Sequence, residues 1–180
     1  MRLLALIAAW AFVMVPALAQ SDDESLRVEA AQRLMQRVDF THVFPGLLER
    51  VQALLAAPDS GALHHLDAAD VMNRALSVAL VDNLSPAQMD DWGGQLNSET
   101  GRRVLEKRAA YRREMKERLG REPSVREIVG DAETGAWDRG LTADEREFLR
   151  REMNPERLAP LSRSVNRALV LILSAEAGRK

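Results

Sequence analysis

The stretch Leu84–Leu119 reads LSPAQMDDWGGQLNSETGRRVLEKRAAYRREMKERL, and it contains two predicted helix starts. At the first start, Ser85 can cap a helix and Pro86 fits the first helical position. Gln88 lies three residues after the cap, where its side chain can reach back to the cap amide. The pattern predicts a short helix that begins at Pro86.

The second start opens the longest helix that the sequence predicts. Ser98 is a favourable N-cap for a helix from Glu99 to Leu119, and Gly120 is a typical residue just after a helix end. We expect Gly101 to leave room for close packing against the preceding short helix. The two helices therefore predict a hairpin with one short arm and one long arm.

The rest of the chain also shows helical patterns. Apolar residues recur every three or four positions, and no sustained alternating run indicates a strand. The first predicted helix carries one apolar stripe, formed by Leu26, Ala30, Leu34 and Val38. The predicted helices outside the hairpin cover about residues 26–38, 47–57, 66–82, 142–153 and 158–178, with a short helix opened at Ser124. The sequence predicts an all-α fold, a compact bundle of about six or seven helices built from helical hairpins.

A shift of 57 residues places the start of the hairpin on a second helix start. Segment 84–119 then aligns with segment 141–177, and Ser85 aligns with Thr142. Each segment reads as a cap, a short helix, an asparagine-centred break and a longer helix. A pseudo-repeated hairpin and a chance likeness between two capped helices both fit this pattern.

The beginning of the chain has the pattern of a secretory signal peptide. Arg2 precedes an apolar run over residues 3–15, and Ala17-Leu18-Ala19 supplies the small residues of a cleavage site. The run is short for a membrane span, so we expect cleavage after this triplet rather than an uncleaved anchor. The sequence predicts a signal peptide at residues 1–19 and a single helical domain at residues 20–180. It also predicts export to the periplasm of a Gram-negative cell, with no transmembrane span after cleavage.

Composition limits the classes of protein that remain. The 180-residue chain contains no cysteine, so disulfides cannot stabilise it in an oxidising compartment. Aromatic residues make up only 4% of the chain, so we expect a core of mainly Leu, Val, Ala and Met. The 25 basic and 27 acidic side chains give a net charge of −2, which is not the footprint of a nucleic-acid-binding protein.

Two segments carry a family resemblance. Leu84-Ser85-Pro86 opens one helix and Ser98-Glu99-Thr100-Gly101-Arg102 opens a longer one. This order resembles the domain of unknown function 2059 family of exported bacterial proteins, in which a capped acidic helix and an aromatic pair precede Ser-Pro-x-Gly. The sequence departs from that pattern because Gln95-Leu96 replaces the aromatic pair and Glu99 replaces the proline. The resemblance covers roughly a third of the chain and implies a helical, exported domain with no catalytic residue to carry over.

One cluster has the residue types of a metal site. His64, His65, Asp67 and Asp70 follow one another closely, and His64 and Asp67 would share a face if that turn were helical. The alternative is a polar helix start with acids near the positive end of the helix dipole. A zinc site normally needs a further ligand, so we predict no metal or cofactor.

The pair Asp90-Asp91 is the other candidate for chemistry, because acid–base catalysis needs two carboxylates in a cleft. It is followed by Trp92 and the flexible Gly93-Gly94, which could line a cleft, but such a pair is more often a solvated helix face with a kink. No nucleophile-elbow serine, cysteine or phosphate-binding glycine loop is present in the sequence.

The long arm carries an excess of basic residues. Nine cations between Glu99 and Arg121 face four acids. One interpretation is self-support of the helix by i,i+4 ion pairs such as Glu99–Arg103 and Glu114–Arg118. The other is a basic ridge that binds an anionic partner. The candidate partner-binding residues are Arg102, Arg103, Lys107, Arg108, Arg112 and Arg113.

The last predicted helix is apolar around most of its circumference near its end. Its main stripe consists of Leu158, Leu161, Val165, Leu169 and Ile172. Val170, Leu171 and Leu173 lie outside this stripe. Enclosure of these three within the monomer is the favoured prediction, since large exposed apolar patches are rare on monomers. The alternative is a seam for a second copy or a partner.

The sequence thus leads to two hypotheses about function. The first is a non-enzymatic exported domain that binds an envelope partner, an anionic surface or itself. The alternative is a metal-dependent or acid–base hydrolase of the cell envelope that uses the histidine cluster or Asp90-Asp91. The two differ in whether these side chains converge in a concave pocket.

Overall fold

The computed structural model describes residues 23–44, 46–57, 61, 63–121, 123 and 140–178, and every regular element in these ranges is helical. The helices are the first one at residues 23–37, α2 (Phe40–Val43), α3 (Leu47–Leu55), α4 (Ala68–Asn83), α5 (Pro86–Leu96), α6 (Glu99–Leu119), α8 (Ala143–Glu152) and α9 (Pro155–Ala177). The predicted all-α bundle is therefore confirmed. The predicted signal peptide and the helix predicted after Ser124 lie outside the described residues.

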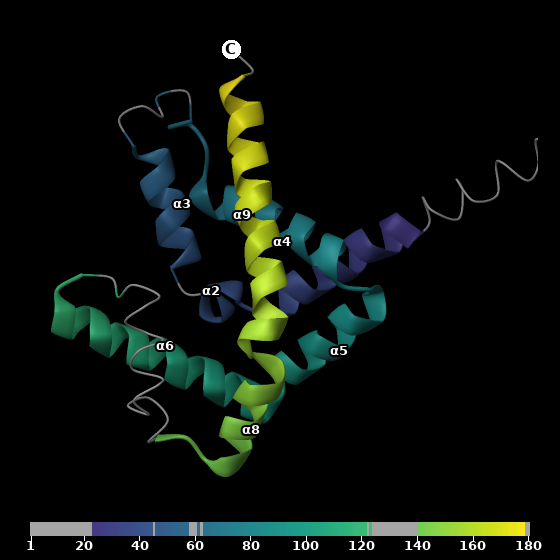
Figure 1. The fold of residues 1–180 in the computed structure, drawn as a ribbon, viewed down its shortest axis with the longest axis vertical. Coiled ribbons are helices and arrows are strands. Elements are labelled where there is room, and N and C mark those ends of the chain that lie inside the picture. The colour runs from purple at the N-terminus through teal and green to yellow at the C-terminus, as the bar shows by residue number, and fades with distance from the viewer. Residues whose placement is uncertain are drawn as a thin grey trace, which may run out of the picture.

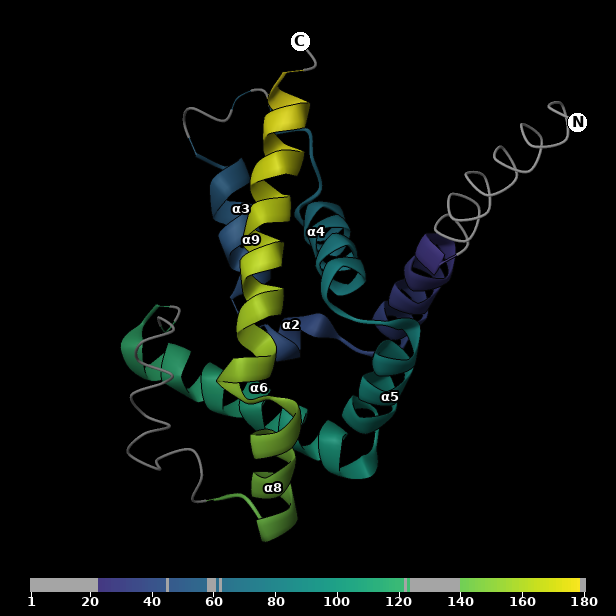
Figure 2. The ribbon, with the colours of Figure 1, turned by 45° about the vertical axis from the view of Figure 1, so that its right-hand side comes forward.

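The helices form two groups that meet at α2. In the upper group of Figure 1, α4 packs against both α9 and α3. In the lower group, α6 contacts α2, α5 and α8. Both views show α8 continuing roughly in line with α9 rather than folding back beside it (Figures 1 and 2). The α5–α6 segment instead turns at a steep angle between its helices, so the two segments differ in shape although they share their order of cap, short helix, break and long helix.

Local sequence signals account for the helix starts. The Ser85 hydroxyl accepts a hydrogen bond from the Gln88 amide at 3.3 Å, and the Gln88 side chain accepts one from the Ser85 amide at 2.8 Å. Thr142 and Glu145 form the same reciprocal capping box at α8. These bonds satisfy amides that have no partner inside the first turn of a helix. The predicted starts at Ser85 and Thr142 are confirmed.

The hairpin turn depends on Gly101. A Cβ atom there would lie 2.4 Å from the Gln95 carbonyl oxygen and 2.5 Å from that of Leu96, so no side chain fits. The Ser98 hydroxyl donates to the Gln95 oxygen at 2.6 Å and accepts from the Gly101 amide at 3.0 Å. The predicted close approach is confirmed, and α6 ends at Gly120, whose φ of 66° suits glycine.

The core lies where the two groups of helices meet. Trp92 of α5 is completely buried, and the Phe40 ring of α2 packs edge-on to it with 5.9 Å between ring centroids. Leu, Val, Ala and Met make up most of the remaining core, as the composition predicts. The Gly93 backbone packs against Leu34 of the first helix, where an added Cβ would lie 2.9 Å from a leucine methyl group.

Two predictions of burial are wrong. Leu26 of the predicted stripe is 55% exposed, because the start of the first helix projects away from the other elements (Figure 2). Val170 and Leu171 are 64% and 63% exposed, because they lie on the side of α9 away from the core, whereas Glu176, further along α9, still pairs with Arg74 of α4 at 3.3 Å. Leu173 is partly buried against the core. Enclosure of the whole α9 end within the monomer is thus incorrect.

None of the helices in the described ranges is both long enough and apolar enough to cross a bilayer.

Candidate functional site

The predicted metal ligands do not converge. Asp67 is the N-cap of α4, and its carboxylate accepts hydrogen bonds from the Ala69 and Asp70 amides at 2.6 and 3.2 Å. His64, His65 and Asp70 are exposed at the surface. No group of three or more metal-ligating side chains occurs among the residues that the structure describes. The capping interpretation therefore explains Asp67.

The pair Asp90-Asp91 is also solvated. Both residues are exposed, and Asp90 forms an ion pair with Arg33 of the first helix at 3.4 Å. The structure does not bring this pair together with the histidine cluster in a pocket. The residues on which the hydrolase hypothesis depends thus do not converge within the described ranges.

The basic residues of α6 divide between two faces of the helix. On one face, Lys107 binds the buried carboxylate of Glu145 at 2.7 Å, and Arg103 lies 3.9 Å from the same group. The hydrogen bond from Lys107, followed by the one from the Thr142 amide, lowers the pKa of Glu145. Arg103 also forms the predicted i,i+4 pair with Glu99 at 3.4 Å. This face joins α6 to α8 and is structural.

The other face of α6 lines a cleft. This basic cleft lies between α2, α3 and α6 and has a volume of about 310 Å³. Its polar lining consists of Thr41, His42, Glu49, Arg108, Arg112, Arg113 and Lys116. Among the described lining residues, four are Arg or Lys and one is a carboxylate, in a protein whose net charge is negative.

Arg108 is the unusual residue of the basic cleft. Burial, together with the neighbouring charge of Arg112, lowers the pKa of Arg108 to about 10. Its guanidinium contacts the sulfur of Met153 at 3.9 Å, a weak acceptor. Across the described ranges, no carboxylate oxygen lies within 4.0 Å of that guanidinium. Arg108 is therefore a largely buried cation that no described carboxylate compensates.

Arg112 has an acidic neighbour at the mouth of the cleft. One of its guanidinium nitrogens lies 3.2 Å from the Glu49 carboxylate of α3. The Arg112 side chain is only 16% exposed, whereas that of Glu49 is 43% exposed. The α2–α3 turn approaches the same guanidinium at Gly46, whose φ of 82° is left-handed. The turn thus places α3 and Glu49 beside α6.

The remaining candidates of the basic ridge face outward. Arg102 and Arg113 are exposed side chains of α6. Arg113 lines the basic cleft and Arg102 does not. The ridge that the sequence predicts is thus split between the contacts with Glu145 and the basic cleft.

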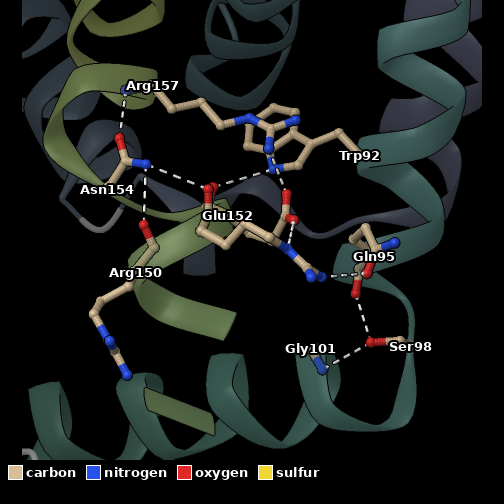
Figure 3. Close-up of polar contacts among 9 residues, drawn as sticks. Trp92, Gln95, Ser98, Gly101, Arg150, Glu152, Asn154 and Arg157 are labelled. Carbon is tan, nitrogen blue, oxygen red and sulfur yellow. Dashed lines mark hydrogen bonds and ion pairs between the residues drawn. The ribbon is translucent and has the colours of Figure 1, made fainter. Parts of the chain in front are cut away.

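The buried carboxylate of Glu152 is bound by arginine side chains of the protein itself (Figure 3). Glu152 is 3% exposed and accepts hydrogen bonds from Arg151 at 2.7 Å and from Arg157. The Arg157 guanidinium lies 5.2 Å from the centre of the Trp92 ring, whose N–H donates to the Glu152 carbonyl oxygen at 3.3 Å. Arg151 also bonds the Gln95 side chain at 3.1 Å. These contacts join α5, α8 and α9, and they pair the buried Glu152 carboxylate with two arginines.

Sequence reasoning missed three of the residues in the basic cleft. Thr41, His42 and Glu49 come from a part of the chain that lies more than 50 residues before Arg108, so no local pattern connects them with it. One signal was present. Arg108 and Arg112 are like charges at i,i+4, an arrangement that destabilises an isolated helix.

Comparison with protein-family models, curated proteins and solved structures found no significant match to this chain. The resemblance to the domain of unknown function 2059 family therefore stays a prediction from the sequence.

Proposed function

We propose that this protein is an exported, non-enzymatic domain of the cell envelope that binds an anionic partner in the basic cleft. The observation that carries the proposal is Arg108, a largely buried guanidinium that lines the cleft without a carboxylate partner among the described residues. Buried charges are normally paired. A bound anion would supply the missing charge.

The surrounding residues support the same proposal. Arg112 and Arg113 add positive charge to the lining, and Glu49 is the acid among its described residues. By contrast, Glu145 and Glu152 are each bound by basic side chains of the protein itself. The two carboxylates that are buried in the described ranges are thus bound by basic side chains of the protein, whereas Arg108 has no carboxylate partner there.

Export rests on the signal-peptide pattern of residues 1–19. The protein recovered from the envelope fraction should have an intact mass that corresponds to a chain beginning at Gln20. A mass that includes Met1, together with a cytoplasmic location, would contradict the proposed compartment.

Anion binding can be tested without knowing the partner. We expect the purified protein to be retained on immobilised dextran sulfate or polyglutamate and to be released by salt, because exposed ion pairs are screened. Overall charge does not explain such retention in a chain of net charge −2. Arg108→Gln should weaken retention, whereas Arg102→Gln, on the same helix but outside the cleft, should not. Equal losses in both variants would contradict the assignment to the cleft.

The exposed end of α9 favours a second candidate function, self-association. Val170 and Leu171 are adjacent in sequence and are both more than 60% exposed. A second copy of the chain could cover them. The elution volume of the purified protein, compared with that of Leu171→Glu, tests this possibility.

A further inference from the structure

We infer that the basic cleft binds one carboxylate group on a short apolar chain, and that Glu49 selects against doubly charged ligands. The inference rests on the proposed anion-binding function and names the chemical class of the ligand. It follows from which cation of the cleft lacks an acidic partner, from the position of Glu49 and from the apolar part of the lining.

Only one Arg or Lys of the described lining is both largely buried and without an acidic partner. Arg112 is already bound by Glu49 at 3.2 Å. Arg113 and Lys116 are exposed, so water and salt screen their charges. Arg108 is largely buried and has no carboxylate oxygen within 4.0 Å among the described residues. One negative charge at Arg108 therefore completes the pairing of the buried cations, with Glu49 left in place.

The Arg108 guanidinium has hydrogen-bonding capacity that a carboxylate can use. A planar guanidinium can donate two parallel hydrogen bonds to the two oxygens of a carboxylate. Within the described ranges, the Arg108 guanidinium instead contacts the sulfur of Met153 at 3.9 Å, which is a weak acceptor. A ligand carboxylate would add charge-assisted hydrogen bonds to a group that the protein leaves with this weak contact.

Glu49 determines how much negative charge the cleft accepts. Its carboxylate lies beside Arg112 and lines the same hollow as Arg108. A carboxylate bound at Arg108 does not need Arg112, so the pair between Arg112 and Glu49 persists. A ligand with a second negative charge would bring that charge into the same small hollow as Glu49, and like charges repel more strongly where water is partly excluded. The cleft therefore favours a monoanion over a dianion of similar size.

The apolar part of the lining fits a short hydrocarbon chain. Leu48 of α3 and Ala109 of α6 are partly buried and line the cleft together with the charged groups. A volume of about 310 Å³ is at the small end of ligand pockets, which suits a carboxylate on a chain of a few carbon atoms. Contact of that chain with Leu48 and Ala109 removes apolar surface from water, a contribution that a simple inorganic anion lacks.

Isothermal titration with three six-carbon probes tests the ligand class. The probes are hexanoate, adipate, which carries a second carboxylate at the other end of its chain, and hexanol, which is uncharged. At pH 7.5 and constant ionic strength, we expect hexanoate to bind and adipate to bind at least about fivefold more weakly, because its second charge faces Glu49. Hexanol should bind much more weakly than hexanoate, because it cannot supply the charge that Arg108 lacks.

Variants test the roles of the two side chains. Arg108→Gln should weaken hexanoate binding at least about tenfold, because charge-assisted hydrogen bonds are lost. Glu49→Gln should strengthen adipate binding severalfold more than hexanoate binding, because it removes the charge that repels the second carboxylate. Arg102→Gln and Glu106→Gln, two exposed α6 positions outside the described lining, are the matched controls and should leave both affinities unchanged.

The outcomes separate this inference from the proposed function. If adipate binds as tightly as hexanoate and Arg108→Gln weakens both, the monocarboxylate class is wrong and anion binding stands. The class is also wrong if neither acid binds while retention on the anionic columns still depends on Arg108. If neither acid binds and retention does not depend on Arg108, both proposals are wrong. Equal effects of Glu49→Gln on the two acids would contradict the selective role of Glu49.

Circular dichroism confirms that each variant is folded. If Arg108→Gln does not fold, Arg108→Lys takes its place, because lysine keeps the positive charge but cannot donate the two parallel hydrogen bonds of a guanidinium. Arg108→Lys should weaken hexanoate binding, and unchanged binding would contradict recognition by the guanidinium. The comparison of hexanoate with adipate in the parent and in Glu49→Gln does not depend on any Arg108 variant.

Free aliphatic acids and the carboxyl end of a peptide share this chemistry, and a further titration distinguishes them. The probes are N-acetyl-trialanine with a free carboxylate and the same peptide with an amidated end. Tighter binding of the free peptide than of hexanoate, lost on amidation, identifies a peptide end as the ligand. Tighter binding of hexanoate identifies a free aliphatic acid. Equal binding of the two peptides would contradict recognition of the carboxylate.

Discussion

At the scale of single residues, the buried charge of Arg108, the proposed binding group, lowers the stability of the fold. Its pKa is lowered to about 10, first by burial and then by Arg112, so the folded state disfavours the charged form relative to the unfolded chain. Arg108 remains charged at neutral pH, below both its folded and its unfolded pKa. The cation is therefore destabilising under these conditions, as is common for groups kept for binding.

We expect Arg108→Met to raise the free energy of unfolding by roughly 1–3 kcal/mol, since the penalty of the buried charge disappears while an apolar stem still fills the space. Urea unfolding at pH 7 measures the change. Arg102→Met replaces an exposed residue and should change stability by less than about 0.5 kcal/mol. A less stable Arg108→Met protein would mean that the guanidinium is compensated in the folded state.

Two glycines of the hairpin make a matched pair. Gly101→Ala places a Cβ atom against the backbone oxygens of Gln95 and Leu96, so we expect a loss of roughly 2–4 kcal/mol. Gly94→Ala meets open space inside α5 and should stabilise the protein by about 0.5–1 kcal/mol, because alanine loses less backbone entropy than glycine. Thermal melts of both variants would show opposite shifts. Equal melting temperatures would contradict the tight turn.

At the scale of helices, Glu145 joins α6 to α8. A carboxylate whose pKa is lowered in the folded state contributes stability above its unfolded pKa of about 4.5, and this contribution is lost as pH falls through the lower folded value. Glu145→Gln should lower the free energy of unfolding by roughly 1–3 kcal/mol at pH 7, because the charge-assisted bond to Lys107 is lost. Urea titrations at pH 7 and pH 3 should show the difference between parent and variant narrowing in acid. A constant difference would exclude an ionic role for Glu145.

The end of α9 permits a second helix-scale test. Leu171→Glu changes a residue that is 63% exposed, so we expect a folded protein whose stability is within about 0.5 kcal/mol of the parent. Leu169→Glu changes a residue that is 3% exposed and should prevent folding, because it buries an unpaired charge. Circular dichroism distinguishes the two results. If the Leu171→Glu protein were unfolded, the result would contradict the exposure of Leu171 and favour its enclosure within the monomer.

The sequence predicted the helix caps correctly but not the exposure of Leu171 or the burial of Glu145, and the reason is physical. Ser85, Ser98 and Thr142 cap helices by contacts within three residues, so their roles are readable from local sequence. Exposure of Leu171 depends on which side of α9 packs on the core, and a helix end that is apolar around most of its circumference does not encode that choice. The role of Glu145 was predictable only in part. Its capping role was readable, but its burial against Lys107 depends on a contact between distant helices.

At the scale of the whole molecule, the basic cleft follows from an arrangement that the sequence did not reveal. The basic character of α6 was predicted from composition. Which of its basic residues face α8 and which face the cleft could not be predicted, because it depends on where α2, α3 and α8 lie. The α2–α3 turn at Gly46 brings Glu49 to Arg112, and α8 brings Glu145 to Lys107. Both contacts join segments more than 35 residues apart, so periodicity within one helix could not supply them.

The environment of Trp92 also determines when folding can be completed. The Trp92 indole of α5 contacts the Glu152 carbonyl group and the Arg157 guanidinium, and both residues follow Trp92 by 60 residues or more. Likewise, α4 packs mainly against α9. A nascent chain therefore cannot form this core until its last segment is available, since distant contacts must wait for loop closure. Such a delay would be compatible with the proposed export, in which the chain is threaded through a translocation channel before it folds. A chain that ends at Met153 should stay largely unfolded, with the fluorescence of a solvated tryptophan.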